Sequence, residues 1–233
     1  LCSCGLPMSQ CELWGDLDNG LDDSWPYGVS PGLPFRSLRR AGAEALVHDP
    51  NWARTVARNL TLYRALSEKA GVDVIVDASK DLSRFYYLYR SGRVRLVPIY
   101  LVRDGRAYMD SMKRRGMPSW RAFLRWTRLN EWVIRFIKSL NGGDRILTLS
   151  YESFVSDPEG TLKSVCERIG VAYEPAMLNY RDVVAHNIAG TRTRFDPGPI
   201  KPHHGWRDRL SRRDRLLFSA LGGKWLNRRY GVR

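Results

Sequence analysis

The sequence predicts an α/β protein in which a parallel β-sheet is flanked by helices. Residues 72–77 are a β-branched run and residues 96–102 a near-continuous apolar run, both of strand length, and each is followed by a polar turn and then a helical pattern. A third predicted strand, residues 145–150, precedes a further helical pattern. Strands that alternate with helices pair in parallel, because each helix carries the chain back to the starting edge of the sheet.

The remaining elements follow in order along the chain. Residues 1–48 are rich in Gly, Pro, Asp and Trp, which predicts an irregular segment. Apolar residues recur at three- and four-residue spacing in 49–70, which predicts an amphipathic helix that stops at Gly71. Further helices are predicted at residues 82–89, 106–115, 119–140, 157–170 and 210–225.

Two local signals bear on these boundaries. Pro98 cannot donate to a β-ladder and weakens the case for a strand at 96–102. Asp157 and Pro158 are favoured residues at a helix N-cap and first position, and Gly170 is a favoured stop. No internal repeat or long linker interrupts the chain, so we expect a single domain over residues 1–233.

Composition bounds the class of protein. The chain has 233 residues, of which 43% are hydrophobic and 27% are charged, values close to the globular average. Disordered and fibrous classes are therefore excluded. No apolar run approaches the roughly 20 residues of a membrane-spanning helix, so we expect no membrane span. Four cysteines are too few for a disulfide scaffold, so we expect a reducing compartment and a cytoplasmic protein.

The charge distribution points to an anionic ligand. Residues 77–233 carry 31 basic and 15 acidic side chains, a net charge of 31 − 15 = +16, and 31 of the 38 basic residues of the whole chain are Arg. The planar guanidinium group suits phosphate and sulfate oxyanions better than an ammonium group does. The alternative interpretation is a basic, solvated surface with no specific ligand.

A group of cysteines opens the chain. Cys2, Cys4 and Cys11 can supply three thiolates to a zinc ion, but a fourth ligand at the usual spacing is lacking and CxC is not the common CxxC form. We therefore expect no metal, and interpret the group as a cluster of buried thiols.

Two polar segments follow predicted strands and describe an oxyanion site. Residues 77–84 combine a carboxylate, hydroxyls and two cations, and residues 103–106 carry two Arg side chains with Ser111 two turns into the next helix. In an open parallel sheet, ligands bind beyond the carboxyl ends of the strands, where helix N-termini favour anions. The alternative is that both segments are ordinary polar turns.

These segments, with two others, resemble the sulfotransferase family, whose members use 3′-phosphoadenosine 5′-phosphosulfate (PAPS). The likeness runs from about residue 72 to 210, and the later part looks like the bacterial branch of the family. Cys2, Cys4 and Cys11 together with Trp14 also look like an insertion seen in that branch. The motifs that carry the resemblance are Val76-Asp77-Ala78-Ser79-Lys80, Leu101-Val102-Arg103-Asp104-Gly105-Arg106-Ala107 with Ser111, Ser150-Tyr151-Glu152-Ser153-Phe154, and residues 186–195 with Trp206-Arg207.

The resemblance implies a P-loop-NTPase-like sulfotransferase fold and a nucleotide site. Arg103 and Ser111 are implied to hold the 3′-phosphate, and Tyr151 to lie near the adenine. Arg192 and Arg194 fall where the family has a loop over the nucleotide. Residues 72–170 then form the β/α nucleotide-binding core, and residues 180–206 the loop that covers it.

Catalysis needs a base, positive charge on the moving sulfonate and in-line geometry. Asp77 sits where some branches of the family place a Glu base, and its carboxylate suits that role if burial raises its pKa. Lys80 and Arg84 are candidates to stabilise the sulfonate or the acceptor. The alternatives are that Asp77 only caps the following turn, or that a histidine is the base: His48, His186, His203 or His204.

One expected motif is missing from the sequence. The family begins with a strand and a loop that cradles the 5′-phosphosulfate, and neither is found, so we expect both the loop and the first strand of the sheet to lie upstream of Leu1. No metal is expected, and the acceptor is a small molecule, glycan or lipid rather than a nucleic acid. Two alternative functions are a non-catalytic basic module that binds nucleic acid or another polyanion, and a nucleotide kinase.

Overall fold

The computed structural model describes residues 2–15, 17, 52–140, 146–180, 182–184, 186–187, 200 and 204–232. The chain groups into two compact units. Unit 1 comprises Leu1–Leu96 with Arg181–Gly198, and unit 2 comprises Val97–Tyr180 with Pro199–Arg233. No helix within the described ranges is both long enough and apolar enough to cross a membrane.

The longest elements in the described part of unit 1 are two helices. After the short 3-10 helix η1 (Met8–Gln10) come α4 (Trp52–Ala70) and α5 (Leu82–Ser91), which contact each other. Both helices were predicted. Helix α4 ends at Gly71, which adopts a φ of 63° that favours glycine, so the predicted stop is confirmed.

The predicted strand at residues 72–77 is wrong. This segment contains no strand, and the side chain of Val76 is 86% exposed. The segment instead bonds back to α4, because the backbone N–H of Val72 donates to the Ser67 carbonyl at 3.1 Å. β-Branched residues favour a strand only where a neighbouring strand supplies a ladder, and no strand lies in the described residues of unit 1.

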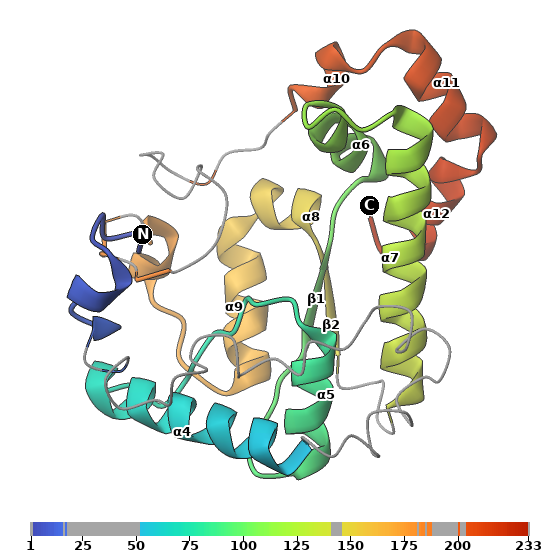
Figure 1. Cartoon of the computed structure of the whole chain (residues 1–233). Coiled ribbons are helices and arrows are strands. Elements are labelled where there is room, and N and C mark those ends of the chain that lie inside the picture. The colour runs from blue at the N-terminus through green and yellow to red at the C-terminus, as the bar shows by residue number, and fades with distance from the viewer. Residues whose placement is uncertain are drawn as a thin grey trace. The chain divides into compact units, whose positions relative to one another are not determined.

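A two-stranded parallel sheet forms the centre of unit 2, so the predicted class, a parallel sheet flanked by helices, is confirmed (Figure 1). Strands β1 (Ile99–Val102) and β2 (Leu147–Ser150) pair with Ile99 opposite Leu147 and Val102 opposite Ser150. Strand β1 begins directly after Pro98, whose carbonyl accepts from the Leu147 N–H, so the proline lies outside the strand. The helices are α6 (Gly105–Lys113), α7 (Ser119–Ser139), α8 (Tyr151–Ser156), α9 (Pro158–Ile169), η4 (Pro175–Asn179), α10 (Trp206–Arg209), α11 (Arg212–Ala220) and α12 (Gly223–Arg229).

The core of unit 2 joins α6 and α7 to the C-terminal helices. Phe218 is fully buried, with its ring edge-on to Phe123 at 5.8 Å, and Trp126 meets Tyr230 at 5.1 Å. Such aromatic pairs stabilise a core beyond their burial alone. The C-terminal segment therefore holds the start of α6 in place.

Several predicted boundaries in unit 2 are confirmed, and one is wrong. Asp157 caps α9 by accepting from the Gly160 N–H, Pro158 is the first residue of that helix, and Gly170 ends it. The single helix predicted at 210–225 is instead α11 and α12, because Gly222 adopts a φ of 74° between them.

Candidate functional site

Arg103 lies at the carboxyl end of β1, where the sequence predicts an oxyanion site. Its backbone carbonyl accepts a hydrogen bond from Trp126 Nε1 at 3.1 Å, which fixes the turn between β1 and α6. Its guanidinium carbon lies 4.7 Å from the centre of the Tyr151 ring. Tyr151 begins α8 directly after β2, and parallel strands end at the same edge of a sheet. The structure thus brings these two predicted residues together.

The Arg103 guanidinium has unused hydrogen-bonding capacity. Within the described residues, its Nε atom is buried and has no hydrogen-bond partner. Buried polar atoms are nearly always paired in folded proteins, so an unpaired buried donor suits an anionic ligand. Ser111 lies two turns into α6 and is partly exposed. The Arg103 donor at this strand end is therefore available to an anion.

The rest of the 103–106 segment has structural roles. Asp104 caps α6 by accepting from the Arg106 N–H at 2.7 Å, and it also pairs with the Arg106 guanidinium. The Gly105 N–H donates to Asn227 Oδ1 at 3.0 Å. These two N–H groups are occupied within the chain, so they are not available to an anion.

A Cβ atom at Gly105 would lie 2.7 Å from the Phe218 ring and 3.0 Å from Trp126. Only glycine lets α6 start this close to the core. The 103–106 segment thus combines one residue with a free donor and three that build the turn.

Glu152 belongs to this site although the sequence analysis assigned it no role. Its Oε1 accepts from the Asp104 N–H at 3.0 Å, while its Oε2 is buried without a partner in the described part of the chain. Burial raises the pKa of Glu152, and the Arg103 charge only partly opposes this. A carboxylate two positions after a strand end is the signal that marks it in the sequence.

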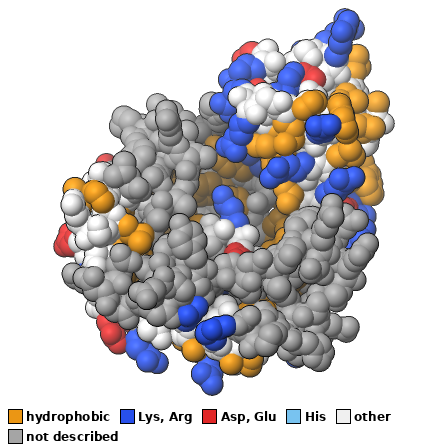
Figure 2. Space-filling view, viewed as in Figure 1, with side chains coloured by type: hydrophobic (Ala, Val, Ile, Leu, Met, Phe, Trp, Pro, Cys, Tyr) orange, Lys and Arg blue, Asp and Glu red, His pale blue; other side chains and the backbone are white. Residues whose placement is uncertain are grey.

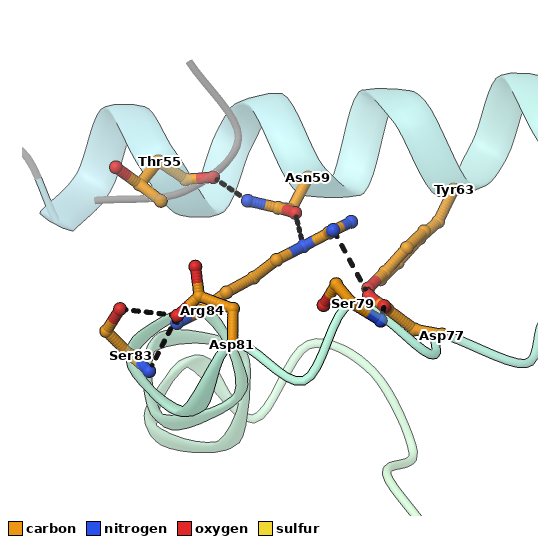
Figure 3. Close-up of polar contacts among 8 residues, drawn as sticks. All are labelled: Thr55, Asn59, Tyr63, Asp77, Ser79, Asp81, Ser83 and Arg84. Carbon is orange, nitrogen blue, oxygen red and sulfur yellow. Dashed lines mark hydrogen bonds and ion pairs between the residues drawn. The ribbon is translucent and has the colours of Figure 1, made fainter. Parts of the chain in front are cut away.

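In unit 1, Asp77 accepts two hydrogen bonds and forms one ion pair (Figure 3). The Tyr63 hydroxyl donates to Oδ2 at 2.6 Å, and the Ser79 N–H donates to Oδ1 at 2.8 Å. Arg84 Nη1 lies 3.3 Å from Oδ2. The carboxylate is therefore held in one orientation at the start of the turn that leads to α5.

The base role considered for Asp77 depended on burial raising its pKa, and the net direction is the reverse. Burial does raise it, but the Tyr63 hydroxyl, the Arg84 charge and the Ser79 N–H outweigh burial, so the pKa of Asp77 is below its usual value. Asp77 is thus ionised at neutral pH.

Arg84 is held as firmly as the carboxylate that it contacts. It is 9% exposed, and its Nε donates to Oδ1 of the fully buried Asn59, whose Nδ2 donates to the Thr55 carbonyl at 2.7 Å (Figure 3). These side-chain contacts link α4 through Arg84 to Asp77, and they orient the carboxylate.

Lys80 is the other predicted catalytic residue in unit 1. It is exposed and adopts a φ of 61°, a left-handed conformation that is strained in residues other than glycine. Strained backbone is concentrated at functional sites, which makes this turn a candidate for one. The next residue, Asp81, caps α5 by accepting from the N–H groups of Ser83 and Arg84.

Other predicted residues lie elsewhere. Arg192, Arg194, His48 and His203 fall outside the described residues. Among the alternative bases, His186 lies beside Cys11, with its Nδ1 atom 3.1 Å from the cysteine sulfur. It therefore supplies the fourth metal-ligating side chain that the sequence spacing did not reveal.

The C-terminal helices present both basic and apolar side chains. Figure 2 shows Lys and Arg side chains there with hydrophobic ones between them. Trp225 is 54% exposed, whereas Arg209 pairs with the buried Asp110 at 2.7 Å. Among the basic side chains at residues 207–215, Arg209 is thus paired with an acidic side chain of the same chain.

Comparison with known proteins gives the family. No curated protein matches the chain. Among solved structures, the chain is similar to the sulfotransferase domain from the curacin biosynthetic pathway, with 18% identity, a TM-score of 0.43, and coverage of 80% of this chain and 77% of that one. The family match does not favour a non-catalytic polyanion-binding module. Because the sulfotransferase family model matches residues 36–175, more than half of the chain, the protein belongs to the sulfotransferase family.

Proposed function

We propose that this protein transfers the sulfonate group of PAPS to a hydroxyl or amine of a small-molecule, glycan or lipid acceptor. Membership of the sulfotransferase family supports group transfer of this kind. The observation that carries the choice of donor is the buried Nε of Arg103, which has no partner among the described residues and lies beside Tyr151 at the end of β1.

The nucleotide contacts in this proposal come from the basic part of the chain. Arg103 and Ser111 bind the 3′-phosphate through charge-assisted hydrogen bonds, and Tyr151 contacts the adenine. Arg192 and Arg194 contribute further positive charge to the nucleotide in this proposal. A guanidinium already ordered against an aromatic ring loses little conformational entropy when it binds an anion.

The acceptor side of the reaction uses the turn before α5. PAPS supplies an activated sulfonate, and its transfer breaks the bond between sulfur and the 5′-phosphate oxygen as a bond from sulfur to the acceptor oxygen or nitrogen forms. Asp77 accepts the acceptor proton, and Lys80 places positive charge near the sulfonate. The hydrogen bond from the Tyr63 hydroxyl to Asp77 is the kind of contact that an acceptor hydroxyl requires.

Calorimetric titration with 3′-phosphoadenosine 5′-phosphate, the product nucleotide, tests the donor assignment. Since hydrogen bonds to charged groups contribute about 1.5–3 kcal/mol, this nucleotide should bind about 10- to 100-fold more tightly than 5′-AMP, which lacks the 3′-phosphate. Equal affinity for the two nucleotides would overturn the assignment. Acceptors are then sought among hydroxyl and amine compounds with PAPS as donor.

A further inference from the structure

Four metal-ligating side chains from distant parts of the sequence meet in unit 1. The Sγ atoms of Cys2, Cys4 and Cys11 and a ring nitrogen of His186 all lie within 4.8 Å of one another. The Cys11 sulfur is 3.6 Å from the Cys2 sulfur and 3.1 Å from His186 Nδ1, and the Cys2 sulfur is 3.9 Å from Nδ1. Cys2 and Cys11 are buried, and the other two are partly buried.

These separations match the edges of a zinc tetrahedron. Zn–S bonds of about 2.3 Å place two sulfur ligands about 3.8 Å apart, and the shorter Zn–N bond of about 2.0 Å brings an imidazole nitrogen slightly closer. A disulfide would need the sulfurs about 2.0 Å apart, and all four cysteines of the chain are free. The arrangement is that of ligands around a common centre.

The histidine is held in place by contacts other than those to the thiols. Trp14 Nε1 donates to the His186 carbonyl at 2.6 Å. The Ser3 N–H donates to the Asn187 carbonyl at 2.9 Å, and the Asn187 N–H donates to Ser3 Oγ at 2.7 Å. Two segments separated by more than 170 residues are thus aligned before any ion binds, so the cost of assembling the site is reduced.

The backbone of residues 2–15 also turns in a way that brings the cysteine side chains together. Gly5 adopts a φ of 90°, which lets the chain turn between Cys4 and Cys11, and the Cys2 N–H donates to the Leu6 carbonyl at 2.9 Å.

We propose that Cys2, Cys4, Cys11 and His186 bind a structural zinc ion. Thiolate and imidazole ligands in a tetrahedron select zinc, and four protein ligands leave no open position for a substrate, which is typical of structural sites. On binding, each thiol S–H bond is replaced by a Zn–S bond and its proton passes to solvent, so three protons are released. No electron is transferred, since zinc is not redox active.

The site is independent of the proposed sulfonate transfer, because none of its ligands takes part in that proposal. Its effect is to fasten the loop at residues 2–15 to residues 186–187, which lie a few positions before Arg192 in the sequence. We therefore expect the ion to stabilise the fold of unit 1.

The test is the metal content and metal affinity of the tag-free chain purified under reducing conditions. Elemental analysis should find about one zinc per chain, and X-ray absorption at the zinc edge should show three sulfur ligands and one nitrogen ligand. His186→Ala and Cys11→Ser should each weaken zinc binding by more than about 100-fold, measured by competition with a chromophoric chelator. Cys166→Ser is the matched control and should bind zinc as the parent chain does, since Cys166 lies in α9, outside the cluster.

Three results would overturn the proposal. One is a reduced chain that binds no zinc in the competition assay. Another is a bound ion with a different ligand set in the absorption spectrum of the parent chain, a measurement that does not depend on any variant folding. The third is a Cys2–Cys11 disulfide in the metal-free protein as purified, detected by peptide mass.

Discussion

The guanidinium carbon of Arg103 lies 4.7 Å from the centre of the Tyr151 ring, so a cation–π contact links the residues that follow the two paired strands. The contact leaves the Arg103 Nε atom buried and unpaired in the described part of the chain. A guanidinium group that is ordered in this way is preorganised to bind an anion. The first prediction concerns this group.

Replacement of Arg103 by Ala should weaken binding of 3′-phosphoadenosine 5′-phosphate by about 10- to 100-fold, because one charge-assisted hydrogen-bonding group is lost. Arg103→Lys should recover only part of the affinity, since an ammonium group lacks the planar fork. Titration calorimetry at fixed ionic strength measures both changes.

The control for this prediction is Arg213→Ala, which removes the same charge from an exposed position on α11. It should leave the affinity within about 2-fold, because screening weakens the influence of a distant exposed charge. Equal losses in the two variants would show that binding follows net charge alone, and the nucleotide site at Arg103 would be refuted.

The second prediction concerns the proton acceptor. Asp77→Asn should lower kcat by about 10²- to 10⁴-fold while leaving affinity for 3′-phosphoadenosine 5′-phosphate unchanged, because the carboxylate acts on the acceptor. The pKa of Asp77 is below its usual value, so the group stays ionised as the pH falls to about 4, and kcat/KM should lose no activity to Asp77 above that pH.

Asp73→Asn is the control for Asp77, since Asp73 is an exposed carboxylate on the same segment, and it should keep parental turnover. An acid limb near pH 6 that persists in Asp77→Asn would assign the base to a histidine instead. Full turnover in Asp77→Asn would leave Asp77 with a purely structural role at the turn.

The third prediction tests why residue 105 is glycine. Gly105→Ala should lower the free energy of unfolding by about 1–3 kcal/mol, because its Cβ would meet the rings of Phe218 and Trp126. Combining it with Phe218→Leu should cost less than the sum of the two single changes, since the smaller side chain makes room. Urea unfolding of the four proteins measures this coupling, and strict additivity would contradict the proposed clash.

How far the sequence could predict this site depends on how local each signal is. Arg103 was predicted to lie in an oxyanion site because it follows a strand, whereas the family resemblance alone implied Tyr151 for that site; the two lie together because both follow paired parallel strands, which end at one edge. Asp157 and Gly170 were predicted at helix ends because capping is decided within a few residues. Signals of this range are readable in a single sequence.

The signals that failed depend on distant partners. The β-branched run 72–77 needed a neighbouring strand, and its composition could not show that the described part of unit 1 has none. His186 completes the cysteine cluster from 175 positions beyond Cys11, so no spacing rule could find it. Asn227, which accepts from the Gly105 N–H, is likewise 122 positions away from its partner.

The last prediction is a pH dependence of stability that comes from Asp214. This buried carboxylate accepts hydrogen bonds from Lys113 Nζ and Ser119 Oγ, and it completes a capping box with Ser211. Burial raises its pKa, but these donors outweigh burial and lower the pKa of Asp214 to about 2. Because the folded pKa is below the unfolded value of about 3.9, the stabilisation is fully present above pH 4 and is lost as the pH falls through about 2.

Asp214→Asn should therefore lower the free energy of unfolding by about 2 kcal/mol at pH 7, and the difference from the parent chain should shrink below pH 4. Urea unfolding at several pH values measures this difference. Asp208→Asn, an exposed change on α10, should alter stability by less than about 0.5 kcal/mol. A difference for Asp214→Asn that stayed constant down to pH 2 would mean that the shape of the side chain, and not its charge, stabilises the junction of α6, α7 and α11.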